Sequence, residues 1–223
     1  MAVPWQIYQI EAMKLTEPVI IPLPDANGML SQAAASKVME LIPKMDAVLI
    51  GPGLGQSQGT ACVLQEVLRC ATCPVVVDAD GINLLSAHTD IVRDRCYPTV
   101  VTPHDVEFTR LGGVLTNNRA ESACILAKQL GCVVLLKGHR SVISDGQSYY
   151  VNHTGNPGMA TGGSGDVLAG VITSLIGQGL SPFSAAAVGA WLHGAAGDLC
   201  AEEIGQYGML PQDMVNALPR LFR

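Results

Sequence analysis

Short, mostly apolar segments without charged residues recur along this chain, and a loop and a helical pattern follow each of them. The clearest cover residues 47–50, 75–77, 99–102 and 133–136. Strands without alternating polar residues are buried on both faces, which is typical of a parallel sheet covered by helices. We therefore predict an α/β fold, with a mainly parallel sheet between two helical layers.

The helical patterns between these segments have recognisable ends. They cover residues 34–42, 59–68, 105–111 and 119–130. Ser31 precedes the first pattern and is a candidate N-cap, and Gly131 follows the last, where glycine commonly ends a helix. Asp145-Gly146 supplies the positive φ angles of a tight turn, so it predicts an antiparallel hairpin across residues 141–151, at the sheet edge.

Two further segments complete the expected layout. Val19 to Leu23 is an apolar run interrupted by proline, which predicts a strand near an edge. Ser181 and Pro182 are typical of a helix start, and the small apolar residues that follow predict a buried helix as far as Cys200. There is no internal repeat or linker, so we expect residues 1–223 to form a single domain.

Several loops that follow predicted strands carry glycine, histidine or a charge. They are Gly51-Pro-Gly-Leu-Gly55, Asp78-Ala-Asp80, Pro103-His104 and Lys137-Gly138. In parallel α/β sheets, ligands bind outside the carboxyl ends of the strands. We therefore expect these loops to meet in one crevice, where the lone cation Lys137 is a candidate ligand for an anion.

A glycine-rich stretch from Asn156 to Gly170 places four glycines before Asp166. The apolar run from Val167 to Ile176 predicts a buried helix, so the glycines are expected at its N-terminus. Free amides there attract phosphate. Asp166 would stay ionised beside them and could accept a proton from a hydroxyl. The alternative is that Asp166 caps the helix.

The charge and the apolar pattern argue against two classes of partner. A formal net charge of −6 without a basic run does not suit a nucleic-acid surface. No segment reaches about 18 uninterrupted apolar residues, the length that a membrane helix requires. The N-terminus also lacks the basic start and apolar core of a signal peptide.

The seven cysteines are an odd number and lie mostly in apolar segments. This usage indicates reduced thiols in a cytoplasmic protein and not a disulfide framework. Cys70 and Cys73 form a single C-x-x-C pair without the additional ligands of a zinc site.

Five motifs together resemble one protein family. They are Gly51-Pro-Gly-Leu-Gly, Val77-Asp-Ala-Asp, Thr102-Pro-His-Asp-Val-Glu-Phe, Leu136-Lys-Gly and Gly155-Asn-Pro-Gly-Met-Ala-Thr-Gly-Gly-Ser-Gly-Asp. In this order they closely resemble the ADP/ATP-dependent NAD(P)H-hydrate dehydratases, over nearly the whole chain. The resemblance implies a ribokinase-like fold, Mg²⁺ as cofactor, and a repair reaction. In that reaction hydrated NADH or NADPH is restored to NAD(P)H while ADP or ATP is consumed.

The resemblance also implies roles for individual residues. Asp166 would be the catalytic base. The residues implied for binding the hydrated nicotinamide are Gly53, Gly55, His104 and Asp166. The residues implied for binding the nucleotide are Lys137, Gly138, His139, Arg140, Ser141, Gly162, Gly163, Ser164 and Gly165. Glu107 lies where the wider superfamily has an acidic residue near Mg²⁺, usually through water.

Some of these residues have a second interpretation. Asp78 and Asp80 border the phosphates in one interpretation and cap the following helix in the other. His104 either contacts the substrate or only bonds to the backbone. Arg140 either contacts the nucleotide or is a solvated charge in its loop.

The start of the chain departs from the family pattern. Family members usually begin with a strand, a glycine-rich turn and a helix, whereas this chain starts at Ala2-Val3-Pro4, after that unit. We expect a βα unit of roughly 30 residues or more to be absent. The sheet edge exposed in this way favours a homo-oligomer.

Two other functions fit the same motifs. One is a kinase of the same superfamily that phosphorylates a small alcohol, and fold analogy does not exclude it. The other is a protein that binds adenine nucleotide without catalysis. The products separate them, because only the dehydratase releases both phosphate and reduced nicotinamide.

Overall fold

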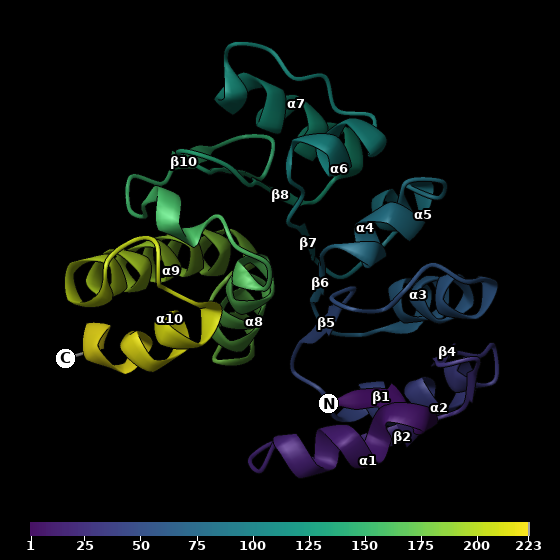
Figure 1. The fold of residues 1–223 in the computed structure, drawn as a ribbon. Coiled ribbons are helices and arrows are strands. Elements are labelled where there is room, and N and C mark those ends of the chain that lie inside the picture. The colour runs from purple at the N-terminus through teal and green to yellow at the C-terminus, as the bar shows by residue number, and fades with distance from the viewer. Residues whose placement is uncertain (223) are drawn as a thin grey trace.

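A six-stranded sheet forms the centre of the computed structural model, which describes residues 1–222. Its strand order is β10-β9-β8-β7-β6-β5 (Figure 1). The bounds are β5 Val48–Ile50, β6 Val75–Val77, β7 Thr99–Val101, β8 Val133–Leu136, β9 Val142–Ser144 and β10 Tyr149–Val151. Strands β5 to β8 are parallel, whereas β9 is antiparallel to both β8 and β10. The predicted parallel sheet with a hairpin at its edge is confirmed.

Helices cover both faces of this sheet (Figure 1). One layer contains α3 Gln58–Cys70, α4 Asp80–Leu85, α5 Asp90–Arg93, α6 Asp105–Arg110 and α7 Arg119–Leu130. The other contains α8 Ser164–Gly177, α9 Pro182–Ile204 and α10 Pro211–Ala217. Residues 1–222 also contain three 3-10 helices, η1 Ile42–Lys44, η2 Pro157–Met159 and η3 Leu218–Leu221. The three-layer α/β arrangement is therefore confirmed.

The apolar strands are explained by the two cores they separate. Val75 and Val77 of β6 pack into the cluster beneath α3 to α7, whereas Val76 packs beneath α8 and α9. All three side chains are 0% exposed. Since the helices bury both faces of the strand, no position in it is left for a polar residue.

Residues 1–44 form a small region beside the sheet. β1 Ala2–Pro4 pairs in parallel with β2 Ile21–Leu23, and β3 Asp25–Ala26 pairs with β4 Met29–Leu30. Two helices lie here, α1 Trp5–Lys14 and α2 Ala34–Leu41. None of α1 is buried, whereas α2 packs on α3. In residues 1–222, β5 pairs with no strand other than β6.

Of the two predicted helix N-caps, one is confirmed and one is wrong. Ser181 accepts a hydrogen bond from the backbone of Ser184 and caps α9, as predicted, but that helix extends beyond Cys200 to Ile204. The Ser31 prediction is wrong, because Ala33 is the N-cap of α2 and no side chain caps that end.

Two expectations concern the chain as a whole. All seven cysteines are free thiols. Within residues 1–222, no helix has both the length and the apolarity that crossing a membrane demands.

Candidate active site

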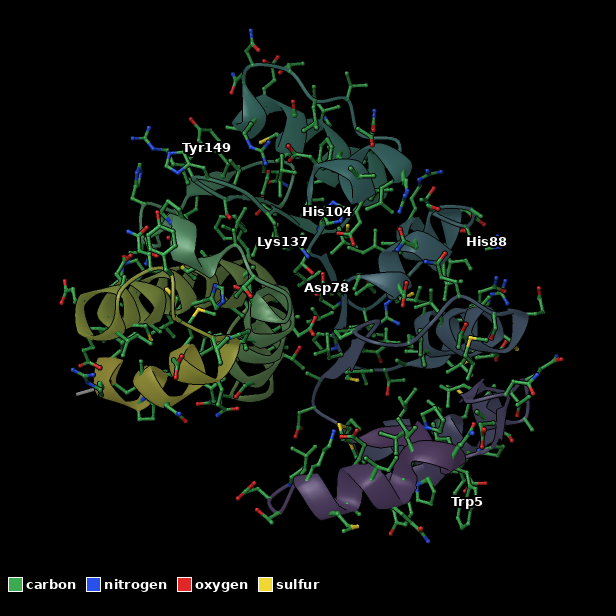
Figure 2. All side chains as sticks on the ribbon, in the orientation of Figure 1. Trp5, Asp78, His88, His104, Lys137 and Tyr149 are labelled. Atoms are coloured by element: carbon green, nitrogen blue, oxygen red, sulfur yellow. The ribbon has the colours of Figure 1, made fainter. Side chains whose placement is uncertain are left out.

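Three loops at the carboxyl ends of the central strands come together. Lys137 follows β8 and Asp78 follows β6, and Nζ of Lys137 lies 2.7 Å from Oδ1 of Asp78. His104 follows β7, which lies between those two strands. Figure 2 shows the three residues close to one another where the layers meet. The predicted convergence is confirmed for these three loops.

Asp78 is the buried residue that connects these loops. Its side chain is 1% exposed, and Oδ1 also accepts a hydrogen bond of 2.8 Å from Oγ1 of Thr102. A buried carboxylate requires such partners, because its desolvation is otherwise uncompensated. The capping interpretation of Asp78 is wrong, because Ala79 is the N-cap of α4 and no side chain caps that helix.

Asp80 does not cap α4 either, but fixes the neighbouring glycine loop. Its carboxylate accepts hydrogen bonds of 2.9 Å from the backbone of Gly55 and from Nε2 of Gln56. Gly51 in the same loop has a φ of +133°, and a Cβ there would lie 1.8 Å from the carbonyl oxygen of Asp78. The loop is thus tied to the end of β6. Gly53 has a φ of +62°, and a Cβ on it would meet no heavy atom within 4 Å, so this glycine borders open space.

His104 and Glu107 cap the start of α6. Nδ1 of His104 accepts hydrogen bonds from the backbone amides of Val106 and Glu107, at 3.1 and 3.3 Å. In return, Oε2 of Glu107 accepts a hydrogen bond of 2.9 Å from the amide of His104. The hydrogen of a neutral imidazole therefore lies on Nε2. The side chain of His104 therefore does bond to the backbone, as one interpretation predicted. It nevertheless remains 53% exposed.

Glu107 itself is nearly enclosed, because its side chain is 6% exposed. Its Oε2 lies 3.8 Å from Nζ of Lys137, and its Oε1 lies 3.4 Å from Nε2 of His104. Residues 1–222 contain no group of three or more His, Cys, Asp and Glu side chains arranged to hold a metal ion. Mg²⁺ needs no such cage when nucleotide phosphates and waters supply most of its ligands.

The loop after β8 forms a turn that hydrogen bonds between Gly138 and Ser141 close. Oγ of Ser141 donates a hydrogen bond of 3.0 Å to the carbonyl of Gly138 and accepts one of 3.3 Å from its amide. Gly138 has a φ of +147° and Arg140 a φ of +55°. His139 and Arg140 are exposed at the tip of this turn.

The glycine turn lies at a helix N-terminus, as predicted. Gly163, with a φ of +90°, is the N-cap of α8, and Ser164, Gly165 and Asp166 form its first turn. A Cβ on Gly165 would lie 3.5 Å from Nζ of Lys137 and 3.9 Å from Oδ2 of Asp78. The amides of the turn and the Lys137 ammonium therefore lie side by side, which is a favourable setting for phosphate. Gly162 is exposed and has open space around it.

Asp166 is exposed in that first turn. Its carboxylate makes no hydrogen bond or ion pair with any residue in 1–222, and no side chain caps α8. The capping alternative is therefore wrong. An ionised carboxylate near the positive end of a helix is stabilised by the helix dipole.

Two polar residues of α9 were missed by the sequence reasoning. Nε2 of the buried His193 lies 3.3 Å from Oγ of Ser164 in the glycine turn. Burial lowers the pKa of His193 to about 4, so its ring is neutral at pH 7. Asp198 accepts hydrogen bonds from the amide of Gly155 and from Nδ2 of Asn156, at 2.8 and 3.0 Å. A polar side chain inside an otherwise apolar helix was the available signal.

Comparison with sequences of known proteins identifies close relatives. The sequence model of one family, described as NAD(P)H-hydrate dehydratase, matches residues 9–220. The bifunctional NAD(P)H-hydrate repair enzyme Nnr of Moorella thermoacetica is 44% identical, over 100% of this chain and 43% of that protein. The ADP-dependent (S)-NAD(P)H-hydrate dehydratase of Neisseria meningitidis is 40% identical, over 72% of this chain and 57% of that protein. The chain thus spans less than two thirds of the length of either relative.

Solved structures share the fold. A ribokinase-like superfamily protein of Enterococcus faecalis superposes with a TM-score of 0.83 at 28% identity, over 99% of this chain and 74% of that one. The ADP/ATP-dependent NAD(P)H-hydrate dehydratase of Bacillus subtilis, co-crystallised with ATP and Mg²⁺, gives a TM-score of 0.72 at 26% identity, over 100% of this chain and 87% of that one. The ribokinase-like prediction is confirmed, and the chain belongs to the NAD(P)H-hydrate dehydratase family.

Proposed function

We propose that this chain restores hydrated NADH and NADPH to NAD(P)H at the cost of ADP or ATP, releasing phosphate and AMP or ADP. The observation that carries the proposal is the Asp166 carboxylate, which has no partner within residues 1–222 and stands in the glycine turn whose Gly165 lies beside the Lys137 ammonium. The family of the chain and the named activity of the Neisseria meningitidis relative support the same reaction.

In the proposed first step, Asp166 accepts the proton of the hydroxyl on the hydrated nicotinamide ring. The hydroxyl oxygen forms a bond to the terminal phosphorus of the nucleotide, and the bond from that phosphorus to the bridging oxygen breaks. The ring nitrogen then donates its electron pair and the carbon–oxygen bond breaks, which releases phosphate. Loss of a proton from the adjacent carbon regenerates the dihydropyridine. A positioned base such as Asp166 contributes on the order of 10² to 10⁴ in rate.

The remaining site residues have binding roles in this proposal. The amides of residues 162–165 and the ammonium of Lys137 bind phosphate oxygens, which is electrostatically favourable at a helix N-terminus. The turn at residues 138–141 contacts the rest of the adenine nucleotide. Gly53, Gly55 and His104 contact the hydrated nicotinamide, and the open space beside Gly53 leaves room for a ring.

Mg²⁺ is proposed to accompany the nucleotide, and the Bacillus subtilis relative was co-crystallised with ATP and Mg²⁺. When bound, it neutralises charge on the phosphates. Glu107 is the proposed protein contact of Mg²⁺. The contact is proposed to run through water, because the Glu107 carboxylate is already engaged in capping α6 and faces Lys137.

Location and assembly extend the proposal. The seven free thiols support a cytoplasmic protein. The outer edge of β5, unpaired within residues 1–222, supports self-association into a homo-oligomer.

The decisive test is to incubate the purified protein with chemically hydrated NADH, ADP and Mg²⁺ and to follow the absorbance of NADH. Recovery of NADH together with free phosphate is the expected result, and omission of the nucleotide is the control. When a small alcohol replaces hydrated NADH, formation of a stable phosphate ester would identify a small-alcohol kinase instead. Binding of ADP without either product would identify a non-catalytic nucleotide-binding protein.

A further inference from the structure

Arg119 at the start of α7 connects two loops of the site. Its Nη1 lies 2.9 Å from Oδ1 of Asp105, the residue after His104. Its Nη2 donates a hydrogen bond of 2.8 Å to the carbonyl of Lys137. One guanidinium therefore contacts both the start of α6, on the proposed hydrate side, and the end of β8, on the proposed nucleotide side.

The loop after β8 is shaped to admit this guanidinium. Gly138 has a φ of +147°, and a Cβ there would lie 2.9 Å from Nη2 of Arg119. Any other residue would be strained at this φ and would crowd the arginine. The conformation of the Gly138 loop and the position of Arg119 thus depend on each other.

One donor of the Arg119 guanidinium is left unsatisfied by residues 1–222. Nε of Arg119 is buried and has no hydrogen-bond partner among residues 1–222. A buried donor without a partner is destabilising, because its desolvation is not compensated. Buried polar atoms without hydrogen-bond partners are expected mainly at functional sites.

We propose that Arg119 is a positioning residue that couples the nucleotide loop to the hydrate loop, so that each ligand strengthens the binding of the other. The proposal rests on the proposed function. A nucleotide held by residues 138–141 orders the Lys137 carbonyl and, through Arg119, the Asp105–His104 end of α6. The hydrate then binds to a loop that is already ordered, and the effect is reciprocal.

Isothermal titration measures this coupling directly. The Kd of α,β-methylene-ADP, whose terminal phosphoryl group is not transferable by the proposed step, is determined with and without saturating hydrated NADH. We expect hydrated NADH to lower this Kd by at least about 5-fold in the wild type, in the usual range of coupling between sites. In Arg119→Gln the two Kd values should agree within about 2-fold.

Two further variants separate positioning from general stability. Arg119→Lys keeps the charge but has no planar fork to reach both partners, so it should also lose the coupling. Arg93→Gln is the matched control, because Nε of Arg93 donates to the carbonyl of Gln129 at the other end of α7. That variant should keep the wild-type ratio, and a melting curve of each variant verifies that it is folded.

The outcomes are distinguishable. If Arg119→Gln or Arg119→Lys keeps the wild-type ratio, or if the wild type shows no coupling although it turns over hydrated NADH, the coupling proposal is wrong and the proposed function stands. If hydrated NADH neither binds nor reacts, the proposed function fails, and the coupling proposal fails with it.

Discussion

The strand-end loops and the glycine turn hold their carboxylates in opposite ways. Asp78, after β6, is 1% exposed, with Lys137 at 2.7 Å and Thr102 at 2.8 Å. Asp166, in the first turn of α8, is exposed and has no partner within residues 1–222. The two regions nevertheless touch, because a Cβ on Gly165 would lie 3.9 Å from Oδ2 of Asp78.

This difference separates a structural charge from the one that we propose to be reactive. A buried carboxylate that is already neutralised by a cation contributes to the position of that cation, and removal of one partner leaves the other uncompensated. A carboxylate without a partner can accept a proton from a substrate without first breaking an ion pair. Substitutions in the two regions should therefore change different measured quantities.

The largest expected effect is on turnover and belongs to Asp166. Asp166→Asn keeps the size of the side chain but removes the proposed base, so recovery of NADH should fall by at least about 10². Nucleotide binding should stay near the wild-type level, because the substitution also removes a negative charge near the phosphates. Steady-state kinetics and an ADP titration measure the two quantities. A variant that retained most of the wild-type turnover would show that Asp166 is not the base.

For Asp78 the expected effect is on stability. Among residues 1–222, Asp78→Asn leaves Glu107, at 3.8 Å, as the charged partner of the Lys137 ammonium. The side chain of Lys137 is 19% exposed, so water compensates in part, and we expect the free energy of unfolding to fall by about 2–3 kcal/mol, somewhat less than for a fully buried pair.

Denaturant unfolding measures this loss. Glu40→Gln is the control, because its partner Lys37 forms an exposed ion pair, for which the expected change is below about 1 kcal/mol. Equal losses in the two variants would contradict the structural role assigned to Asp78.

His104 caps α6 and is also proposed to bind the hydrate, and two substitutions separate these roles. His104→Ala removes the N-cap of α6 and the exposed ring, so it should raise the KM for hydrated NADH by about 5–10-fold, with kcat little changed, and also lower stability by about 1 kcal/mol. His104→Asn restores a capping side chain without the ring. Stability should then recover while KM stays high. Recovery of the wild-type KM in His104→Asn would mean that the ring acts only as a cap.

The sequence predicted the parts of the site that depend on local signals. The strand ends and the glycine turn were predicted correctly, because apolar runs and glycines determine local backbone structure. The ion pair between Asp78 and Lys137 was not predicted, because it joins residues 59 positions apart and depends on the strand order. For the same reason Asp78 was assigned a possible capping role, and the contacts of Arg119 and His193 were not foreseen.

The smallest expected effect concerns the hydrogen bond between His193 and Ser164 in the glycine turn, which is a neutral contact and not an ion pair. Burial lowers the pKa of His193 to about 4 in the folded protein, from 6.5 when exposed. The unfolded chain therefore binds more protons between these values, so the contribution of His193 is complete above about pH 6.5, declines as the pH falls towards 4, and then levels off. The expected loss is on the order of 1 kcal/mol between pH 7 and pH 5.5. His193→Gln keeps a side chain that can hydrogen-bond to Ser164 but does not titrate, so its free energy of unfolding should fall less over this interval. Parallel pH profiles of the two proteins would exclude His193 as the titrating group.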